Sequence, residues 1–193
     1  MREAVAVIKL FLSKISMNNE TYKSALIRMN SELSKLSKVR FIGYGLQKGR
    51  ALGTLSLVDE KKIIEMPVAE NLMVGFGIGL SLKGYFPIVF IERMDFILNA
   101  LDAIVNHLDK IKEKSGTQFS PGLIIRCVVG NRTKPLYTGI THTKDYSEAI
   151  SKMISFPVIK ILKVEDVEIS YKIAIENLKC GKPTILVEYK DLI

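Results

Sequence analysis

The most constraining feature of this 193-residue sequence is the regular alternation of short apolar runs with longer segments of helical periodicity. The apolar runs are typical of buried strands, and they span residues 39–44, 61–66, 86–91, 122–129, 158–162 and 185–189. The helical segments span residues 20–36, 69–82, 96–114, 146–154 and 167–178. Because strands that alternate with helices form parallel sheets covered on both faces, the sequence predicts a single α/β domain with a mostly parallel sheet.

The N-terminal residues stand apart from this pattern. Residues 4–15 are apolar but are interrupted by Lys9 and Lys14. This spacing is typical of an amphipathic helix rather than of a membrane span or a secretory signal. We therefore expect a helical extension over residues 1–19 and one domain over residues 20–193.

Composition excludes several classes of protein. Apolar residues make up 48% of the chain, which argues against disorder. The net charge of +8 is spread along the chain without an aromatic-lined basic stripe, so nucleic acid is not an expected partner. Cys127 and Cys180 fit neither a disulfide framework nor a metal motif, which favours a reducing, cytoplasmic location. No apolar run is long enough to cross a membrane, so no membrane partner is expected either.

Glu70 is the leading candidate for a functional side chain. It follows an apolar run that ends at Pro67, and it stands in the first turn of a predicted helix rich in small residues. A carboxylate in a first helical turn is ordinarily explained by the helix dipole alone. The residues around Glu70 favour a more specific interpretation.

The string from Met66 to Gly84 resembles the pyrimidine-binding domain of thiamine-diphosphate enzymes. It is most similar to the β subunit of pyruvate-type 2-oxo acid dehydrogenases, in the transketolase-like family. The family has a strand, a proline, small residues, a glutamate and a glycine-rich helix in this order. The similarity runs with gaps from about Thr21 to the C-terminus, and it is sharp again at Met94 to Asn106 and Gly139 to Thr143.

This resemblance implies that Glu70 is both a cofactor-binding and a catalytic residue. In the family, the glutamate at this place binds a nitrogen of the aminopyrimidine ring of thiamine diphosphate. A carboxylate there favours the imino tautomer of the cofactor, whose nitrogen removes a proton from the thiazolium ring. The protein then supplies placement and proton transfer, while the cofactor supplies the carbanion chemistry.

Two more site residues are implied by the same resemblance. Phe96 matches the aromatic residue that packs against the aminopyrimidine, although a phenylalanine at this spacing is otherwise explained as a core residue. Residues 131–143 lack periodicity and are predicted to form a loop, in which His142 matches the family's active-site histidine. A histidine facing the substrate can donate to a developing oxyanion, whereas the plain alternative is a solvated loop residue.

The sequence also departs from the family pattern. After Gly43 the family carries an acidic residue, where this chain has Tyr44, and residues 47–59 diverge. The change implies a different acyl substrate. The chain ends at Ile193, where family β subunits continue into another domain, which favours a free-standing decarboxylase or a transketolase-like enzyme over a member of a large complex.

The metal site of the family is missing from the sequence. The family holds Mg²⁺ and the cofactor's diphosphate with a Gly-Asp-Gly segment and a downstream asparagine, which are oxygen ligands suited to this ion. This chain contains no Gly-Asp-Gly, so no metal ligand is assigned to it. A separate α-type subunit is expected to hold the metal, in a heterotetramer built around a homodimer of this chain.

The prediction is therefore a β-like subunit of a split thiamine-diphosphate enzyme that acts on a 2-oxo acid or a ketose-like donor. The alternative is a non-catalytic, regulatory or degenerate member of the same fold. A dinucleotide-binding oxidoreductase is disfavoured, because the glycines from Gly75 to Gly79 lie inside a helix and lack the fingerprint spacing. Close packing of the helix explains these glycines better.

Overall fold

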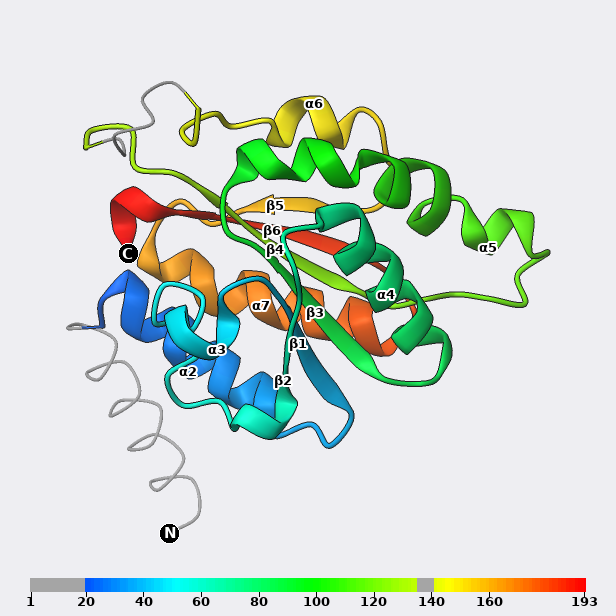
Figure 1. The fold of residues 1–193 in the computed structure, drawn as a ribbon, viewed down its shortest axis with the longest axis horizontal. Coiled ribbons are helices and arrows are strands. Elements are labelled where there is room, and N and C mark those ends of the chain that lie inside the picture. Colours follow the sequence, from blue (N-terminus) through cyan, green and yellow to red (C-terminus); the bar gives the residue numbers. More distant parts are fainter. Residues whose placement is uncertain (1–19, 135–140) are drawn as a thin grey trace, which may run out of the picture.

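The structure is a computed structural model that describes residues 20–134 and 141–193 (Figure 1). Six parallel strands form one sheet in the order β2-β1-β3-β4-β6-β5. The strands are β1 (Val39–Gly43), β2 (Ile63–Glu65), β3 (Phe86–Ile91), β4 (Ile124–Val129), β5 (Val158–Lys160) and β6 (Thr184–Tyr189). The predicted α/β domain is confirmed, and the sheet is parallel throughout. The predicted helix at residues 4–15 lies outside the described residues.

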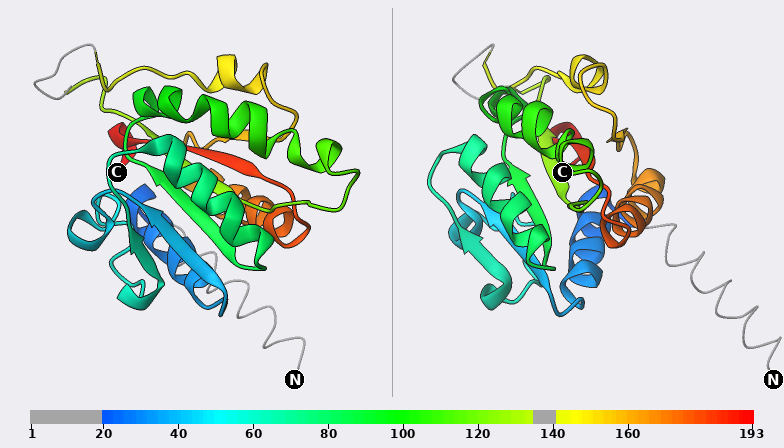
Figure 2. Two further views of the ribbon diagram at one scale, coloured as in Figure 1. Left: turned by 45° about the vertical axis from the view of Figure 1, so that its right-hand side comes forward. Right: turned by 90° about the vertical axis from the view of Figure 1, so that its right-hand side faces the viewer.

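Helices cover both faces of the sheet, as the alternation predicts (Figure 2). One face packs against α2 (Tyr22–Ser34) and α7 (Val164–Lys179). The other face packs against α4 (Glu70–Leu82), α6 (Ser147–Ser151) and the helical segments η2 (Met94–Ala100) and η3 (Asp102–Leu108). Shorter elements complete the chain: α3 (Leu46–Gly49), η1 (Glu60–Lys62), α5 (Ile111–Lys114) and η4 (Lys190–Leu192). None of the helices among the described residues is long and apolar enough to cross a bilayer.

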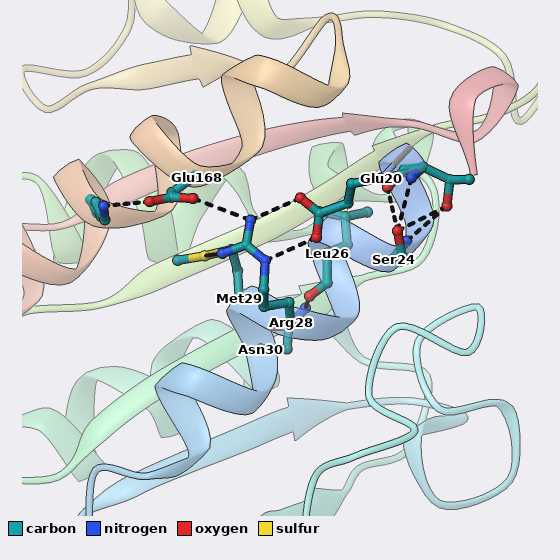
Figure 3. A network of polar contacts seen from close by, with 9 residues as sticks. Glu20, Ser24, Leu26, Arg28, Met29, Asn30 and Glu168 are labelled. Carbon is teal, nitrogen blue, oxygen red and sulfur yellow. Dashed lines mark hydrogen bonds and ion pairs between the residues drawn. The ribbon is translucent and has the colours of Figure 1, made fainter. Parts of the chain in front are cut away.

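Helix α2 begins with a capping box and is fixed to α7 by charge (Figure 3). The side chains of Thr21 and Ser24 satisfy each other's backbone N–H groups at the start of the helix. Arg28 then donates to Glu20 at 2.9 Å and lies 3.2 Å from Glu168 on α7. The first described residue is therefore anchored beside the N-terminal half of α7.

The predicted helix over residues 96–114 is wrong in its details. The structure has a 3₁₀ segment, η2, then a π-helical segment, η3, and only then the short helix α5. The backbone N–H of Ala103 donates to the side chain of Asn71 on α4 at 3.0 Å. The Asn71 side chain, which belongs to another helix, thus accepts from a backbone N–H inside this segment. That N–H is no longer available for a regular i to i−4 hydrogen bond, which explains the irregular helix.

Close packing explains only one of the three glycines in α4. A Cβ atom at Gly77 would lie 2.8 Å from a methyl group of Leu123 and 3.0 Å from Val89, so this glycine lets α4 approach the sheet. By contrast, a Cβ at Gly75 or Gly79 would meet no atom of the described residues within 4 Å. Within residues 20–134 and 141–193, the packing interpretation is therefore confirmed at Gly77 and wrong at the other two positions.

A buried ion pair crosses strands β4 and β6 beneath α7. Arg126 donates to Glu188 through two nitrogens, at 2.8 and 2.9 Å, and both side chains are fully buried. The hydroxyl group of Thr54 accepts from Arg126 at 2.9 Å, and that of Tyr171 donates to Glu188 at 2.8 Å. The remaining guanidinium nitrogen, Nη1, has no partner among the described residues. Burial alone would lower the pKa of Arg126, but the adjacent Glu188 carboxylate reverses this effect and raises it. Local sequence patterns do not predict this pair, because Arg126 stands in an apolar run.

Replacing Arg126 by methionine should destabilise the fold by about 3–5 kcal/mol, because it leaves the buried Glu188 carboxylate without its cation. The double change Arg126→Met/Glu188→Leu should recover most of that loss, because neither buried charge is left alone. Urea unfolding measures both. The exposed pair of Lys152 and Glu148 is the control, since Lys152→Met should change stability by less than about 1 kcal/mol. A double variant no better than the single one would contradict this account.

Candidate functional site

A cavity of about 240 Å³ opens at the carboxyl edge of the sheet, between β1 and β3. Strand β1 pairs with β2 on one side and with β3 on the other. The chain that leaves β1 runs to β2, away from β3. Loops that leave in opposite directions open a crevice at such a point, where ligands of open α/β sheets bind. The lining residues are Tyr44, Val68, Glu70, Met73, Phe90, Ile91, Glu92 and Phe96.

Glu70 lies in the wall of this cavity as the first residue of α4. Its side chain is buried, with 6% of the residue exposed. Among the residues that the structure describes, the side chain of Asn99 donates to its carboxylate, with a long nitrogen–oxygen distance of 3.5 Å. A buried carboxylate with one weak donor is costly unless a further donor completes it. The helix N-terminus offsets part of this cost, and the cavity leaves room for a ligand that donates the missing hydrogen bond.

Phe96 lines the same cavity from the 3₁₀ segment η2. Its neighbours Met94 and Ile97 are fully buried and fix the segment against the sheet. The apolar ring, together with Met73 and Ile91, gives the cavity a mainly apolar lining around the Glu70 carboxylate, with Glu92 as the second acid in the lining. Such a lining suits a flat heteroaromatic ring that carries a hydrogen-bond donor.

His142 comes to this site from a different part of the chain. Its ring meets the Phe96 ring edge to face, with centroids 5.1 Å apart and an interplanar angle of 84°. The backbone there has φ of 113°, a left-handed conformation that residues other than glycine rarely adopt. Strain of this kind is concentrated at functional sites. The side chain of Thr141 lies 2.9 Å from Nδ1 of the imidazole.

The segment that carries His142 is held against η2 by backbone contacts. The N–H of Lys144 donates to Asp95 at 3.3 Å, and the N–H of Tyr146 contacts the sulfur of Met94 at 3.3 Å. A Cβ atom at Gly130 would collide with the carbonyl oxygen of His142, so glycine is required for this close approach. Gly139, which belongs to the same sequence motif, lies outside the described residues.

The structure thus brings Glu70, Phe96 and His142 together from three separate segments. Sequence reasoning did not assign Asn99 or Glu92 to the site. A signal existed for Glu92, since it directly follows a predicted strand and so stands at the carboxyl edge of the sheet. Asn99 gave no such signal, because its role depends on the 3₁₀ geometry of η2.

Tyr44 lies at the mouth of the cavity, where the family pattern has an acid. The carboxylate of Glu65 accepts hydrogen bonds from the N–H groups of Gly45 and Gln47, at 2.5 and 2.8 Å. These contacts fix the turn that carries Tyr44. Val68 flanks the same opening, so its rim is apolar and aromatic.

The described residues offer no comparable place for a metal ion. They contain no group of three or more His, Cys, Asp or Glu side chains arranged to bind one. The only acids that line the cavity are Glu70 and Glu92, and Arg93 lies 3.2 Å from the Glu92 carboxylate. Across residues 20–134 and 141–193, the chemistry therefore fits an aromatic ring but not a metal-bound diphosphate.

Comparison with known proteins identifies relatives of this chain. Residues 20–126 match the sequence profile of the family described as transketolase, pyrimidine binding domain. The chain is 26% identical over 190 residues, or 96% of its length, to pyruvate dehydrogenase E1 component subunit beta, mitochondrial, of Saccharomyces cerevisiae. It is 36% identical over 46% of its length to 2-oxoisovalerate dehydrogenase subunit beta 2, mitochondrial, of Arabidopsis thaliana.

A solved structure confirms the fold. A protein described as split gene transketolase, inactive beta4 tetramer, superposes with a TM-score of 0.67 at 16% identity, over 88% of this chain and 51% of that one. The chain spans half of the yeast relative and 25% of the plant relative. These relatives are therefore longer proteins, of which the chain matches a part.

Gly130→Ala should displace His142 from the ring of Phe96, because the added Cβ collides with backbone rather than with a flexible side chain. Ring-current effects make the imidazole ¹H shifts of His142 a direct readout. The chain has two histidines, so the variant His107→Gln assigns the signals. Gly75→Ala is the control, because its Cβ meets nothing and the shifts should stay unchanged. Unchanged shifts in Gly130→Ala would show that the contact does not depend on this glycine.

Proposed function

The chain belongs to the family of transketolase pyrimidine-binding domains, and we propose that it is the β-like subunit of a split, heteromeric thiamine-diphosphate enzyme. The observation that carries this proposal is the buried Glu70 carboxylate in a mainly apolar cavity, with Phe96 in the same wall and His142 against Phe96. The residues fit the pyrimidine half of the cofactor.

Each of these residues has a distinct task in the proposal. When bound, thiamine diphosphate supplies the carbanion that attacks a carbonyl group. Glu70 holds a proton between its carboxylate and the pyrimidine nitrogen, while Asn99 orients the carboxylate. Phe96 and Met73, which line the cavity, would hold the pyrimidine ring and exclude water from Glu70. A carboxylate in such dry surroundings transfers its proton to a fixed partner rather than to solvent.

His142 is proposed to act on the substrate rather than on the pyrimidine. Its edge-to-face contact with Phe96, which lines the cavity, supports a position for the imidazole near the cavity. From there it can donate a hydrogen bond to an oxygen that becomes negative during the reaction. The strained backbone fixes the imidazole before the substrate arrives, which reduces the reorganisation needed in the transition state.

The substrate class follows from the relatives and from the rim of the cavity. We propose a 2-oxo acid or a ketose-like donor, in decarboxylation, dehydrogenation or transketolase-like group transfer. The names of the relatives support this range, since they are 2-oxo acid dehydrogenase β subunits and a transketolase. Tyr44 at the rim replaces an acid with an aromatic side chain, which favours a less polar acyl group.

The proposal requires a partner chain. An α-type subunit with the Gly-Asp-Gly and asparagine ligands would hold Mg²⁺ and the diphosphate, in a heterotetramer of two copies of each chain. Two observations support this arrangement. The described residues lack a metal cluster, and a relative of the same fold is a split transketolase whose β chains alone form an inactive tetramer.

A non-catalytic member of the fold is the second candidate, and Tyr44 in place of the family's acid is the observation that favours it. A relic of this kind has no reason to keep a poorly satisfied, buried Glu70 beside an open cavity. Cofactor binding in the presence of the partner separates the two candidates.

The isolated chain should bind thiamine diphosphate weakly or not at all, because the residues that the structure describes include no metal site for the diphosphate. Isothermal calorimetry with Mg²⁺ measures this. Adding an α-type chain with Gly-Asp-Gly should produce tight binding at one cofactor per pair of chains. Tight stoichiometric binding by the isolated chain would contradict the split-enzyme proposal.

In the assembled enzyme, Glu70→Ala should slow proton loss from the thiazolium carbon by roughly 10²–10⁴-fold, as is typical of general acid–base contributions. Glu70→Gln should also be slow, because an amide does not exchange a proton with the ring in the same way. Hydrogen–deuterium exchange at that carbon is the measurement. The fold should survive, since a first-turn glutamate contributes only about 0.3–1 kcal/mol through the helix dipole. Equal exchange rates in wild type and variants would reduce Glu70 to a helix-terminal residue.

A further inference from the structure

The outer face of α7 carries large apolar side chains that nothing among the described residues covers. Ile169 is 60% exposed and Ile173 is 41% exposed. They lie one helical turn apart, so they share one side of the helix. Glu165 and Glu176 are also exposed and lie one turn before Ile169 and about one turn after Ile173. This face, defined by Glu165, Ile169, Ile173 and Glu176, is called the outer α7 face.

The chain reaches α7 from its N-terminal side. Glu20 is held by Arg28, and the same guanidinium pairs with Glu168, the residue before Ile169 (Figure 3). Glu20, the first described residue, therefore lies beside α7. A segment that precedes it in the chain is covalently tethered close to the outer α7 face.

We propose that residues 4–15 of this chain dock on the outer α7 face as an amphipathic helix. The segment is rich in apolar side chains and has Ile8 and Leu12 one turn apart, which matches the spacing of Ile169 and Ile173. Its charges complement the surface, since it carries Lys9 and Lys14 and no acid, whereas the face carries two glutamates. The exposed Lys172 beside them is already paired with Glu168.

The dimensions agree with this docking. Twelve helical residues extend for about 18 Å, and the sixteen residues of α7 extend for about 24 Å, so the segment fits along the helix. Residues 16–19 can span up to about 13 Å, which is a usual length for a link between packed antiparallel helices. A tether of this length gives an effective concentration in the millimolar range, so a modest apolar contact is enough to keep the segment docked.

A single introduced thiol tests the proposal. In a Cys180→Ser background, Ile173→Cys places a thiol on the outer α7 face, while the native Cys127 is buried and its pKa is raised by burial. The rate of reaction with a disulfide reagent should be about tenfold lower in the full chain than in a chain that begins at Met17. That ratio corresponds to docking for about nine-tenths of the time. Met153→Cys on the opposite face of the sheet is the control, with equal rates at both lengths.

A second variant removes the contact without shortening the chain. Ile8→Asp/Leu12→Asp should make the introduced thiol as reactive as in the shortened chain, whereas Ser13→Asp should leave it protected. Equal rates in the full and shortened chains would overturn the proposal. So would protection that grows with protein concentration, because the occupant is then a second copy. The thiol could also react equally fast in the full and the shortened chain while only the full chain binds phosphatidylserine vesicles. That result would overturn the proposal and show that the segment binds membranes instead.

Discussion

The candidate site depends on the coupling between α4 and the irregular segment that follows β3. Two asparagines make this coupling. Asn71 on α4 accepts from the backbone of Ala103, and Asn99 on η2 donates to Glu70. The first contact takes a donor out of the helical ladder, and the second lies where the 3₁₀ turns have rotated Asn99 towards α4. Irregular helix geometry at this point is therefore part of how Glu70 and Phe96 come to line one cavity.

The opposite face of the sheet supports the same cavity by a different interaction. The guanidinium of Arg126 lies 5.2 Å from the ring centre of Phe90, and Phe90 is one of the cavity residues. Because Glu188 and Thr54 accept hydrogen bonds from the guanidinium, Phe90 packs on a group that cannot shift without breaking a buried ion pair. A buried pair contributes little net stability compared with apolar packing, but it does specify one arrangement of β3, β4 and β6. Phe90, and with it this wall of the cavity, is held in place by the same arrangement.

Local patterns in the sequence predict most of the fold, because buried strands and their covering helices differ in the periodicity of their apolar residues. The strand Phe86–Ile91 is predicted to the residue, and the six predicted strands all occur. The errors fall where a distant side chain overrides the local pattern. The segment 96–114 reads as one regular helix, yet Asn71 breaks its ladder from another helix. Likewise, Arg126 in an apolar run gives no sign of Glu188, which lies 62 residues away.

The candidate site is also predicted only in part from the sequence. The family resemblance predicts Glu70, Phe96 and His142 as site residues. Glu70 and Phe96 lie in the same cavity, and the His142 ring contacts Phe96. Their roles stay predictions, because contact alone does not establish chemistry. The physical argument for a ligand is independent of the resemblance and lies in the Glu70 carboxylate. It is largely buried, it lines a cavity, and among the described residues it accepts one long hydrogen bond, from Asn99. The helix dipole offsets only part of the cost of burying it, whereas a bound ring that donates to the carboxylate would complete its hydrogen bonds.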